Sequence, residues 1–237
     1  MKKLIADLSQ RKAVTVLRLL YPIWFVAGLF GVMYVPTTLI VSGDAATTAN
    51  NILANELLFN MGIVGSLLTQ LIFIFVVLAL YKLFKPVNKN HAFLMVTFAL
   101  VAVPIAMLNT LNRVAALLIV KGPDYLSAFE PAQLQSLMMF FLDLNAQGVF
   151  IASIFWGLWL FPLGYLIYKS GYFPRILGIL VILGGIGYTV DSFIRLLLPS
   201  FESIFLQALL ILTVGELIFI GWLLFKGAKL PEITKGT

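Results

Sequence analysis

The chain has 237 residues, of which 61% are hydrophobic and only 11% are charged, and its mean hydropathy is +1.04. Soluble domains carry about 25% charged residues, so this composition predicts an all-α, polytopic integral membrane protein instead. The net charge of +6 does not indicate nucleic-acid binding, because the basic residues are scattered at the ends of apolar segments. There is no cysteine, which excludes disulfides, thiol catalysis and thiolate metal sites.

Six segments are apolar and long enough to cross a bilayer as helices, because a hydrocarbon core of about 30 Å needs roughly 20 helical residues. In chain order they are residues about 14–40, 57–84, 91–120, 135–168, 174–198 and 203–226. The first is far longer than the core of a signal peptide, so we expect it to be retained. Glycine and proline mark the breaks between segments. We therefore predict one transmembrane domain over residues 1–237, built as a six-helix bundle.

The polar connectors carry two helix-start signals. Thr47 or Thr48 is expected to cap the helix that follows the first connector. Pro131 suits the first position of the helix that contains the fourth span.

The basic residues predict the orientation of the bundle. One side collects Lys2, Lys3, Arg11, Lys12, Arg18, Lys82, Lys85, Lys89, Lys169, Arg175, Lys226, Lys229 and Lys235. The other side has Lys121 alone, together with Asp44, Glu56, Asp124, Glu130 and Glu202. By the positive-inside rule, both termini are expected to be cytoplasmic.

Polar residues interrupt the predicted spans in a regular way. Four pairs have the spacing i,i+4, which puts both members of a pair on one helix face. These pairs are Glu56/Asn60, Asn109/Arg113, Asp143/Gln147 and Asp191/Arg195, and Asn145 and Glu216 complete the set. With the predicted orientation, all of them lie between the midplane and the outer surface. Exposure of four polar stripes to lipid would be costly, so we expect the stripes to face a shared pocket.

The charges in this set do not balance. Asp191 and Arg195 can pair within one helix, and Arg113 can pair with Asp143 or with Glu216. One acid is then left without a partner, and Glu216, the deepest, is the candidate proton carrier. The alternative is that the polar network only fixes helix packing.

Several other chemistries lack the residues they need. The lone histidine, His91, lies at the cytoplasmic end of the third span, far from the outer carboxylates. Histidine-based triads and histidine-rich zinc sites are therefore not expected. No metal or other cofactor is predicted, and no catalytic residue is assigned.

Four stretches of the chain resemble a bacterial membrane-protein family known as domain of unknown function 4386. They are residues 42–56 (SGDAATTANNILANE), 80–88 (LYKLFKPVN), 124–134 (DYLSAFEPAQL) and 170–178 (SGYFPRILG). The resemblance implies a multi-pass protein of the bacterial inner membrane and brings no established activity. In the family pattern, histidine tends to occupy the position of Asn145. Asparagine can form hydrogen bonds at this position but cannot transfer a proton as histidine can. This difference favours a binding or structural role over a catalytic one.

Three functions follow from these observations. The favoured one is binding or transport of a small polar, anionic or lipid ligand, with Arg113 and Arg195 holding the anion. The first alternative is a non-enzymatic accessory protein whose polar network only fixes the bundle. The second alternative is an intramembrane enzyme acting on a lipid, with Asp143 as the acid or base. The lipid bilayer is the partner expected in every case, and the oligomeric state is not predicted.

Overall fold

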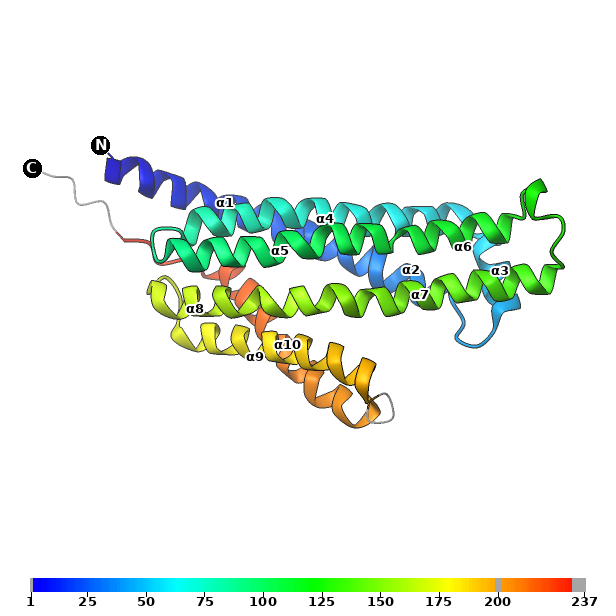
Figure 1. The fold of residues 1–237 in the computed structure, drawn as a ribbon. Helices are drawn as coiled ribbons and strands as arrows, with labels where there is room; N and C mark the ends of the chain where they lie inside the picture. The colour runs from blue at the N-terminus through cyan, green and yellow to red at the C-terminus, as the bar shows by residue number, and fades with distance from the viewer. Residues whose placement is uncertain (1, 199–201, 232–237) are drawn as a thin grey trace, which may run out of the picture. The chain divides into compact units, whose positions relative to one another are not determined.

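The computed structural model describes residues 2–198 and 202–231, with side chains described for residues 10–195, 197–198 and 214–231. Every element in this part of the chain is helical, and their order can be followed along the chain in Figure 1. The elements are α1 (Lys2–Gly28), the π-helix η1 (Leu29–Tyr34), α2 (Val35–Leu39), α3 (Ala45–Ala54), α4 (Glu56–Phe84), α5 (Lys89–Asn109), α6 (Leu111–Lys121), the 3-10 helix η2 (Asp124–Leu126), α7 (Pro131–Leu158), α8 (Leu160–Ser170), α9 (Arg175–Leu197) and α10 (Glu202–Phe225). The all-helical prediction is confirmed for the described residues.

Five stretches of helix among the described residues are long and apolar enough to cross a membrane. They are Gln10–Leu39, Glu56–Phe84, Lys89–Lys121, Pro131–Ser170 and Arg175–Arg195, and they match the first five predicted spans. The sixth predicted span, 203–226, corresponds to α10. Its described apolar part, Val214–Phe225, is shorter than a full crossing, so a sixth crossing and the cytoplasmic termini remain predictions.

Two of these stretches are much longer than a bilayer requires. At 1.5 Å per residue, the 40 residues of Pro131–Ser170 extend about 60 Å, and the 33 residues of Lys89–Lys121 extend about 50 Å. A hydrocarbon core is only about 30 Å thick. Part of each helix therefore projects beyond the lipid unless it is steeply tilted.

The chain divides into two compact units whose boundaries fall inside long helices. Unit 1 comprises Met1–Pro22, Ile74–Ala102 and Phe150–Thr237, and unit 2 comprises Ile23–Phe73 and Val103–Val149. α1, α4, α5 and α7 each contribute residues to both units. The expectation of a single domain stays a prediction.

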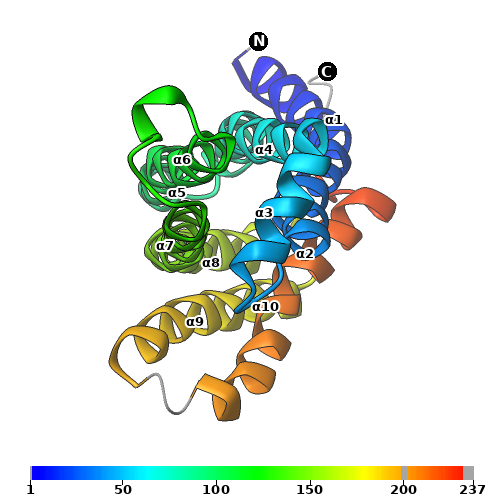
Figure 2. The same cartoon turned by 90° about the vertical axis from the view of Figure 1, so that its right-hand side faces the viewer.

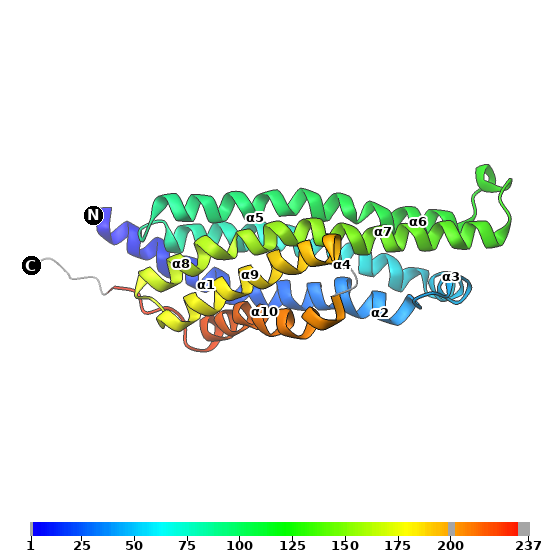
Figure 3. The ribbon, with the colours of Figure 1, turned by 60° about the horizontal axis from the view of Figure 1, so that its bottom comes forward.

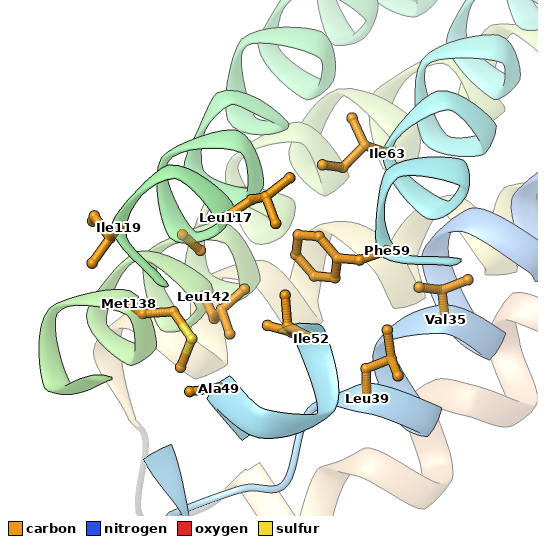
Figure 4. Packing of buried hydrophobic residues seen from close by; sticks show 11 residues of the cluster. Val35, Leu39, Ala49, Ile52, Phe59, Ile63, Leu117, Ile119, Met138 and Leu142 are labelled. Carbon is orange, nitrogen blue, oxygen red and sulfur yellow. The ribbon is translucent and has the colours of Figure 1, made fainter. Parts of the chain in front are cut away.

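Unit 2 has an apolar core that joins α2, α3, α4, α6 and the first half of α7. Buried members of this core are Val35, Leu39, Ala49, Ile52, Phe59, Ile63, Ala116, Leu117, Ile119, Met138 and Leu142. Figure 4 shows these side chains converging from the separate helices. The short helix α3 lies beside both α2 and α6, as Figure 2 illustrates.

The start of α3 differs from the sequence prediction. Asp44, not Thr47 or Thr48, is the N-cap residue: its Oδ1 accepts from the Thr47 backbone N–H at 2.9 Å, and its Oδ2 accepts from Thr47 Oγ1 at 2.6 Å. These hydrogen bonds lower the pKa of the Asp44 carboxyl. Thr48 instead bridges to the Val41 backbone N–H and carbonyl. The prediction placed the cap three or four residues too late.

The start of α7 agrees with the prediction. Pro131 is its first residue, and the Gln133 side chain accepts a hydrogen bond from the Glu130 N–H at 2.9 Å. A side chain at the third helical position that reaches back to the cap residue forms half of a capping box. This contact fixes where α7 begins.

Unit 1 is held together by helices in close contact and by stacked rings. α9 packs along α8 and α10, and the pair α9–α10 is visible in Figure 3. Glycines permit the approach, since a Cβ on Gly164 would meet the Gly178 carbonyl at 2.6 Å. The His91 ring stacks on Tyr165, with centroids 4.0 Å apart, so His91 is half-buried rather than fully solvated.

Candidate functional site

Arg113 is the most deeply buried ionisable side chain of unit 2. It lies on α6 with 4% of its surface exposed. Its Nη1 donates to the Gly31 carbonyl at 2.9 Å and to Ser66 Oγ at 3.0 Å. Ser66 in turn donates to the Gly62 carbonyl on the same helix, α4. One guanidinium nitrogen therefore joins α6 to α4 and to the π-helix η1.

The Gly31 carbonyl is available because of the local helix geometry. Within η1 the hydrogen bonds run to the fifth residue back, as in the bond from the Val35 N–H to the Phe30 carbonyl. The next donor in this register would be residue 36, but Pro36 has no N–H. The Gly31 carbonyl therefore has no backbone N–H to accept from in this register, and Arg113 Nη1 donates a hydrogen bond to it instead.

Gly31 also determines how closely η1 can approach α4. A Cβ at this position would lie 2.7 Å from the Gly65 carbonyl carbon and 2.8 Å from the Gly62 oxygen. Only a residue without a side chain allows the two backbones to meet here. The guanidinium of Arg113 reaches both helices because they are this close.

The other terminal nitrogen of Arg113, Nη2, is buried without a hydrogen-bond partner. The guanidinium carbon lies 5.7 Å from the centroid of the buried Phe59 ring, a cation–π distance. The described residues give Arg113 no ion pair. The predicted pairing with Asp143 is therefore wrong: Asp143 lies on an exposed face of α7, and Glu216, the other predicted partner, belongs to unit 1.

Asn109 and Asn145 form a reciprocal pair between α5 and α7. Asn109 Nδ2 donates to the Asn145 carbonyl at 2.8 Å, and Asn145 Nδ2 donates to the Asn109 carbonyl at 3.0 Å. Asn112 Nδ2 donates to Asn109 Oδ1 at 2.9 Å. The helices approach at this point because of Gly148, where a Cβ would collide with the Asn109 amide. The predicted hydrogen-bonding role of Asn145 is thus satisfied within the helix pair.

The remaining predicted site residues of unit 2 have contacts separate from those of Arg113. Glu56 pairs with Lys121, with Nζ and Oε1 2.7 Å apart, and both side chains are largely exposed. Asn60 is half-buried, and Gln147, like Asp143, is exposed. Of the seven predicted residues of unit 2, Arg113, the Asn109–Asn145 pair and Glu56 therefore take part in three separate sets of contacts, and Asn60, Asp143 and Gln147 belong to none of these sets.

Asp191 and Arg195, in unit 1, form the ion pair that their spacing predicts. Arg195 Nε lies 2.9 Å from Asp191 Oδ2, and the side chains are 16% and 24% exposed for Arg195 and Asp191. The Arg195 guanidinium also covers the Phe150 ring at 4.5 Å from its centroid. The ion pair itself lies within one face of α9, and the Phe150 contact joins Arg195 to α7.

Glu216 is the predicted proton carrier and belongs to unit 1. Its side chain is half-buried on α10, and the described residues give its carboxylate no hydrogen bond or ion pair. Tyr21 and Tyr188 are close enough to interact with its charge. Glu216 is therefore an acid in an apolar setting with two phenol groups nearby.

Sequence reasoning missed three participants in the Arg113 cluster: Gly31, Ser66 and Phe59. The sequence held only a partial signal: Pro36 leaves one carbonyl of the preceding turn without its donor, which in an α-helix would be that of Val32, and the π register shifts it to Gly31. A second feature of unit 2 is a shallow, largely apolar groove beside the start of α7, lined by Phe129, Ala132, Gln133, Ser136, Leu137 and Phe140. None of the predicted site residues lines it.

The described residues contain no group of three or more acidic or histidine side chains arranged to hold a metal ion.

Comparison with known proteins identifies the class to which this multi-helix membrane protein belongs. Residues 18–227 match the family described as Domain of unknown function (DUF4386), and the chain belongs to that family. A protein from Archaeoglobus fulgidus, described as an uncharacterized protein, is 32% identical over 173 residues, which cover 72% of this chain and 86% of the relative. No solved structure matches the chain. The family resemblance noted in the sequence is thereby confirmed.

Proposed function

We propose that the chain is a six-span protein of the cell membrane, with both termini in the cytoplasm, and that it binds an oxyanion group of a small polar or lipid ligand at Arg113. One observation carries the ligand proposal: the guanidinium is 4% exposed, has no acidic partner among the described residues, and leaves Nη2 without an acceptor. An arginine stays protonated when buried, and a buried charge without a partner costs about 3–5 kcal/mol. A carboxylate or phosphate would offset this cost.

The chemistry of the guanidinium favours an oxyanion over other ligands. Its planar fork of N–H donors matches a carboxylate or phosphate, which can accept two hydrogen bonds at once. Nη1 already donates to Gly31 and Ser66, so the ligand would bind through Nη2. Entry of the ligand requires a side chain to move, because Nη2 is shielded from solvent.

The length of α5 and α6 supports a position near the outer surface of the membrane. Counting from Lys89 at the basic end, about 20 residues cross the hydrocarbon core, which reaches Asn109. Arg113 lies one helical turn further. This is the depth of lipid head groups, where carboxylates and phosphates are found.

The test compares two basic residues of α6. Arg113→Met should abolish co-purification of an anionic ligand, measured by native mass spectrometry of the protein in mild detergent, whereas Lys121→Met should retain it. Lys121 is the matched control because it is largely exposed and pairs with Glu56. Equal ligand occupancy in the two variants would overturn the proposal.

A structural role for Arg113 is the second candidate, and the unpaired Gly31 carbonyl favours it. In that case the guanidinium only replaces a missing backbone donor and joins three helices. Arg113→Gln, which keeps amide donors without the charge, should then restore the melting temperature lost in Arg113→Met. If Arg113→Gln folds well and still lacks the ligand, the binding proposal stands.

Transport coupled to protons is one form of the binding proposal and would involve Glu216. Glu216→Gln should then leave ligand binding at Arg113 unchanged and remove the pH dependence of uptake into proteoliposomes. Unchanged pH dependence would exclude this form. The enzymatic alternative has less support, because Asp143 is exposed and the Asn145 amide is engaged with Asn109; retained activity in Asp143→Asn would exclude it.

A further inference from the structure

One end of unit 1 gathers three chain segments around Tyr172. The Lys229 N–H donates to the Tyr172 carbonyl at 2.9 Å, so the segment after α10 meets the α8–α9 turn. Gln10 Nε2 donates both to the Leu83 carbonyl and to the Tyr172 hydroxyl, each at 2.9 Å. The Phe84 ring stacks near Tyr172, with centroids 6.4 Å apart. The ends of α4, α8 and α10 are thus fixed side by side.

These segments carry exposed cations and no acids. We call the following six residues the basic collar: Lys82, Lys85, Lys89, Lys169, Arg175 and Lys229. All six are exposed, and the stretches 80–91, 168–178 and 224–231 that contain them have neither Asp nor Glu. The described part of the chain gives none of the six an ion pair. No acid among the described residues of unit 1 therefore offsets their mutual repulsion through an ion pair.

Two of the collar cations lie against tyrosine rings. Lys85 Nζ lies 5.6 Å from the Tyr81 ring centroid, and the Arg175 guanidinium carbon lies 5.4 Å from the Tyr168 ring centroid. Tyrosine is enriched where a membrane meets water, because its ring is apolar and its hydroxyl is polar. Apolar helix begins directly beyond the collar, in α5 and α9. The cations therefore lie at the ends of helices that are apolar and long enough to cross a membrane.

We propose that the basic collar binds the phosphate groups of anionic phospholipids in the leaflet around it. Clustered Lys and Arg beside a hydrocarbon boundary attract anionic head groups through the same electrostatic term that draws polybasic segments to acidic membranes. The lipid supplies the negative charge that the three stretches lack, and its acyl chains cover the apolar faces of the adjoining helices. This site is independent of Arg113, which belongs to unit 2.

The test measures lipid binding to the purified full chain by native mass spectrometry. Phosphatidylglycerol should bind at least tenfold more tightly than phosphatidylcholine, and the preference should fall as salt concentration rises. The combined variant Lys85→Gln, Lys89→Gln, Lys169→Gln and Arg175→Gln should remove the preference, while Lys121→Gln in unit 2 leaves it intact. Circular dichroism and gel filtration verify that the variants fold. If the combined variant does not fold, the double variant Lys85→Gln, Lys89→Gln replaces it in the binding measurement.

Inorganic phosphate distinguishes a lipid site from a site for small anions. An excess of free phosphate at constant ionic strength should not displace phosphatidylglycerol, because the acyl chains contribute to binding. Displacement by phosphate, equal binding of the two lipids, or an undiminished preference in the collar variants would each overturn the proposal.

Discussion

Unit 1 and unit 2 differ in the sign of their net charge and in how their polar side chains connect helices. Of the 16 Lys and Arg residues in the chain, only Arg113 and Lys121 belong to unit 2. Unit 2 nevertheless holds five of the 10 acids, Asp44, Glu56, Asp124, Glu130 and Asp143. Unit 1 exposes the basic collar at helix ends and joins its helices through rings, glycine contacts and the buried Gln10 amide. Unit 2 buries a cation and joins its helices through side-chain amides and a guanidinium.

This contrast shows that a buried polar residue has two different uses in one chain. In unit 2 the hydrogen bonds of Arg113, Asn109 and Asn145 cross between helices, so they determine which helices are neighbours. In unit 1 the Asp191–Arg195 ion pair forms within α9, and the contact of Arg195 with α7 is to the Phe150 ring. Loss of an interhelical contact should therefore cost more than loss of an ion pair within a helix.

The largest effect is expected at Gly31. Gly31→Ala should destabilise unit 2 by about 3 kcal/mol or more, because the new Cβ meets backbone atoms of α4 that cannot move aside. Gly28→Ala is the control: its Cβ would make ordinary contact with Thr69 at 3.6 Å, and alanine favours helix by about 1 kcal/mol. Thermal unfolding in detergent compares the two. Equal melting temperatures would mean that η1 and α4 do not pack closely.

The asparagine pair should have the next largest effect. Asn109→Ala and Asn145→Ala should each lower the free energy of unfolding by about 1 kcal/mol, and the double variant by about 2 kcal/mol, since each loses one interhelical hydrogen bond. Gln147→Ala, on an exposed face of α7, should leave stability unchanged. The same unfolding assay applies, and a Gln147→Ala variant as unstable as Asn145→Ala would contradict the assigned role.

The ion pair of unit 1 should matter less. A double-mutant cycle with Asp191→Asn and Arg195→Gln should give a coupling energy of about 0.5 kcal/mol, as for i,i+4 pairs at other partly exposed positions. A coupling above about 2 kcal/mol would show that unit 1 also depends on buried charge, and the contrast between the units would fail.

The smallest effect is a local pH dependence in α3. The pKa of Asp44 is lowered in the folded state by its bonds to Thr47, so the cap stabilises α3 fully above the unfolded pKa of about 4. The contribution is lost as the pH falls through the lower folded-state pKa. Hydrogen exchange of α3 amides should accelerate below pH 4 in the native chain but not in Asp44→Asn, which keeps a capping oxygen without titrating there. Parallel pH profiles for the two proteins would exclude Asp44 as the cause.

Some features of the site could be predicted from local sequence and some could not. Asp191 and Arg195 were predicted as a pair because four residues of helix place them on one face. Arg113 was predicted to be buried and polar, but its partners were not. One of its two predicted partners, Asp143, is exposed, and a backbone carbonyl accepts the hydrogen bond from Arg113 instead. The family pattern at Asn145 indicated a hydrogen bond, although not that Asn109 would complete it.

The sequence by itself determined the apolar helical segments, the breaks at Gly43, Gly122 and Gly171, and the position of each charge along its helix. These follow from composition and from the helical period, which depend only on neighbours in the chain. The tertiary structure alone decided which groups meet. Arg113 contacts Gly31 because Pro36 leaves that carbonyl without a donor and because a glycine lets η1 touch α4. The helical period gives the face and height of a side chain, whereas its partner depends on which helix lies opposite and how closely it approaches.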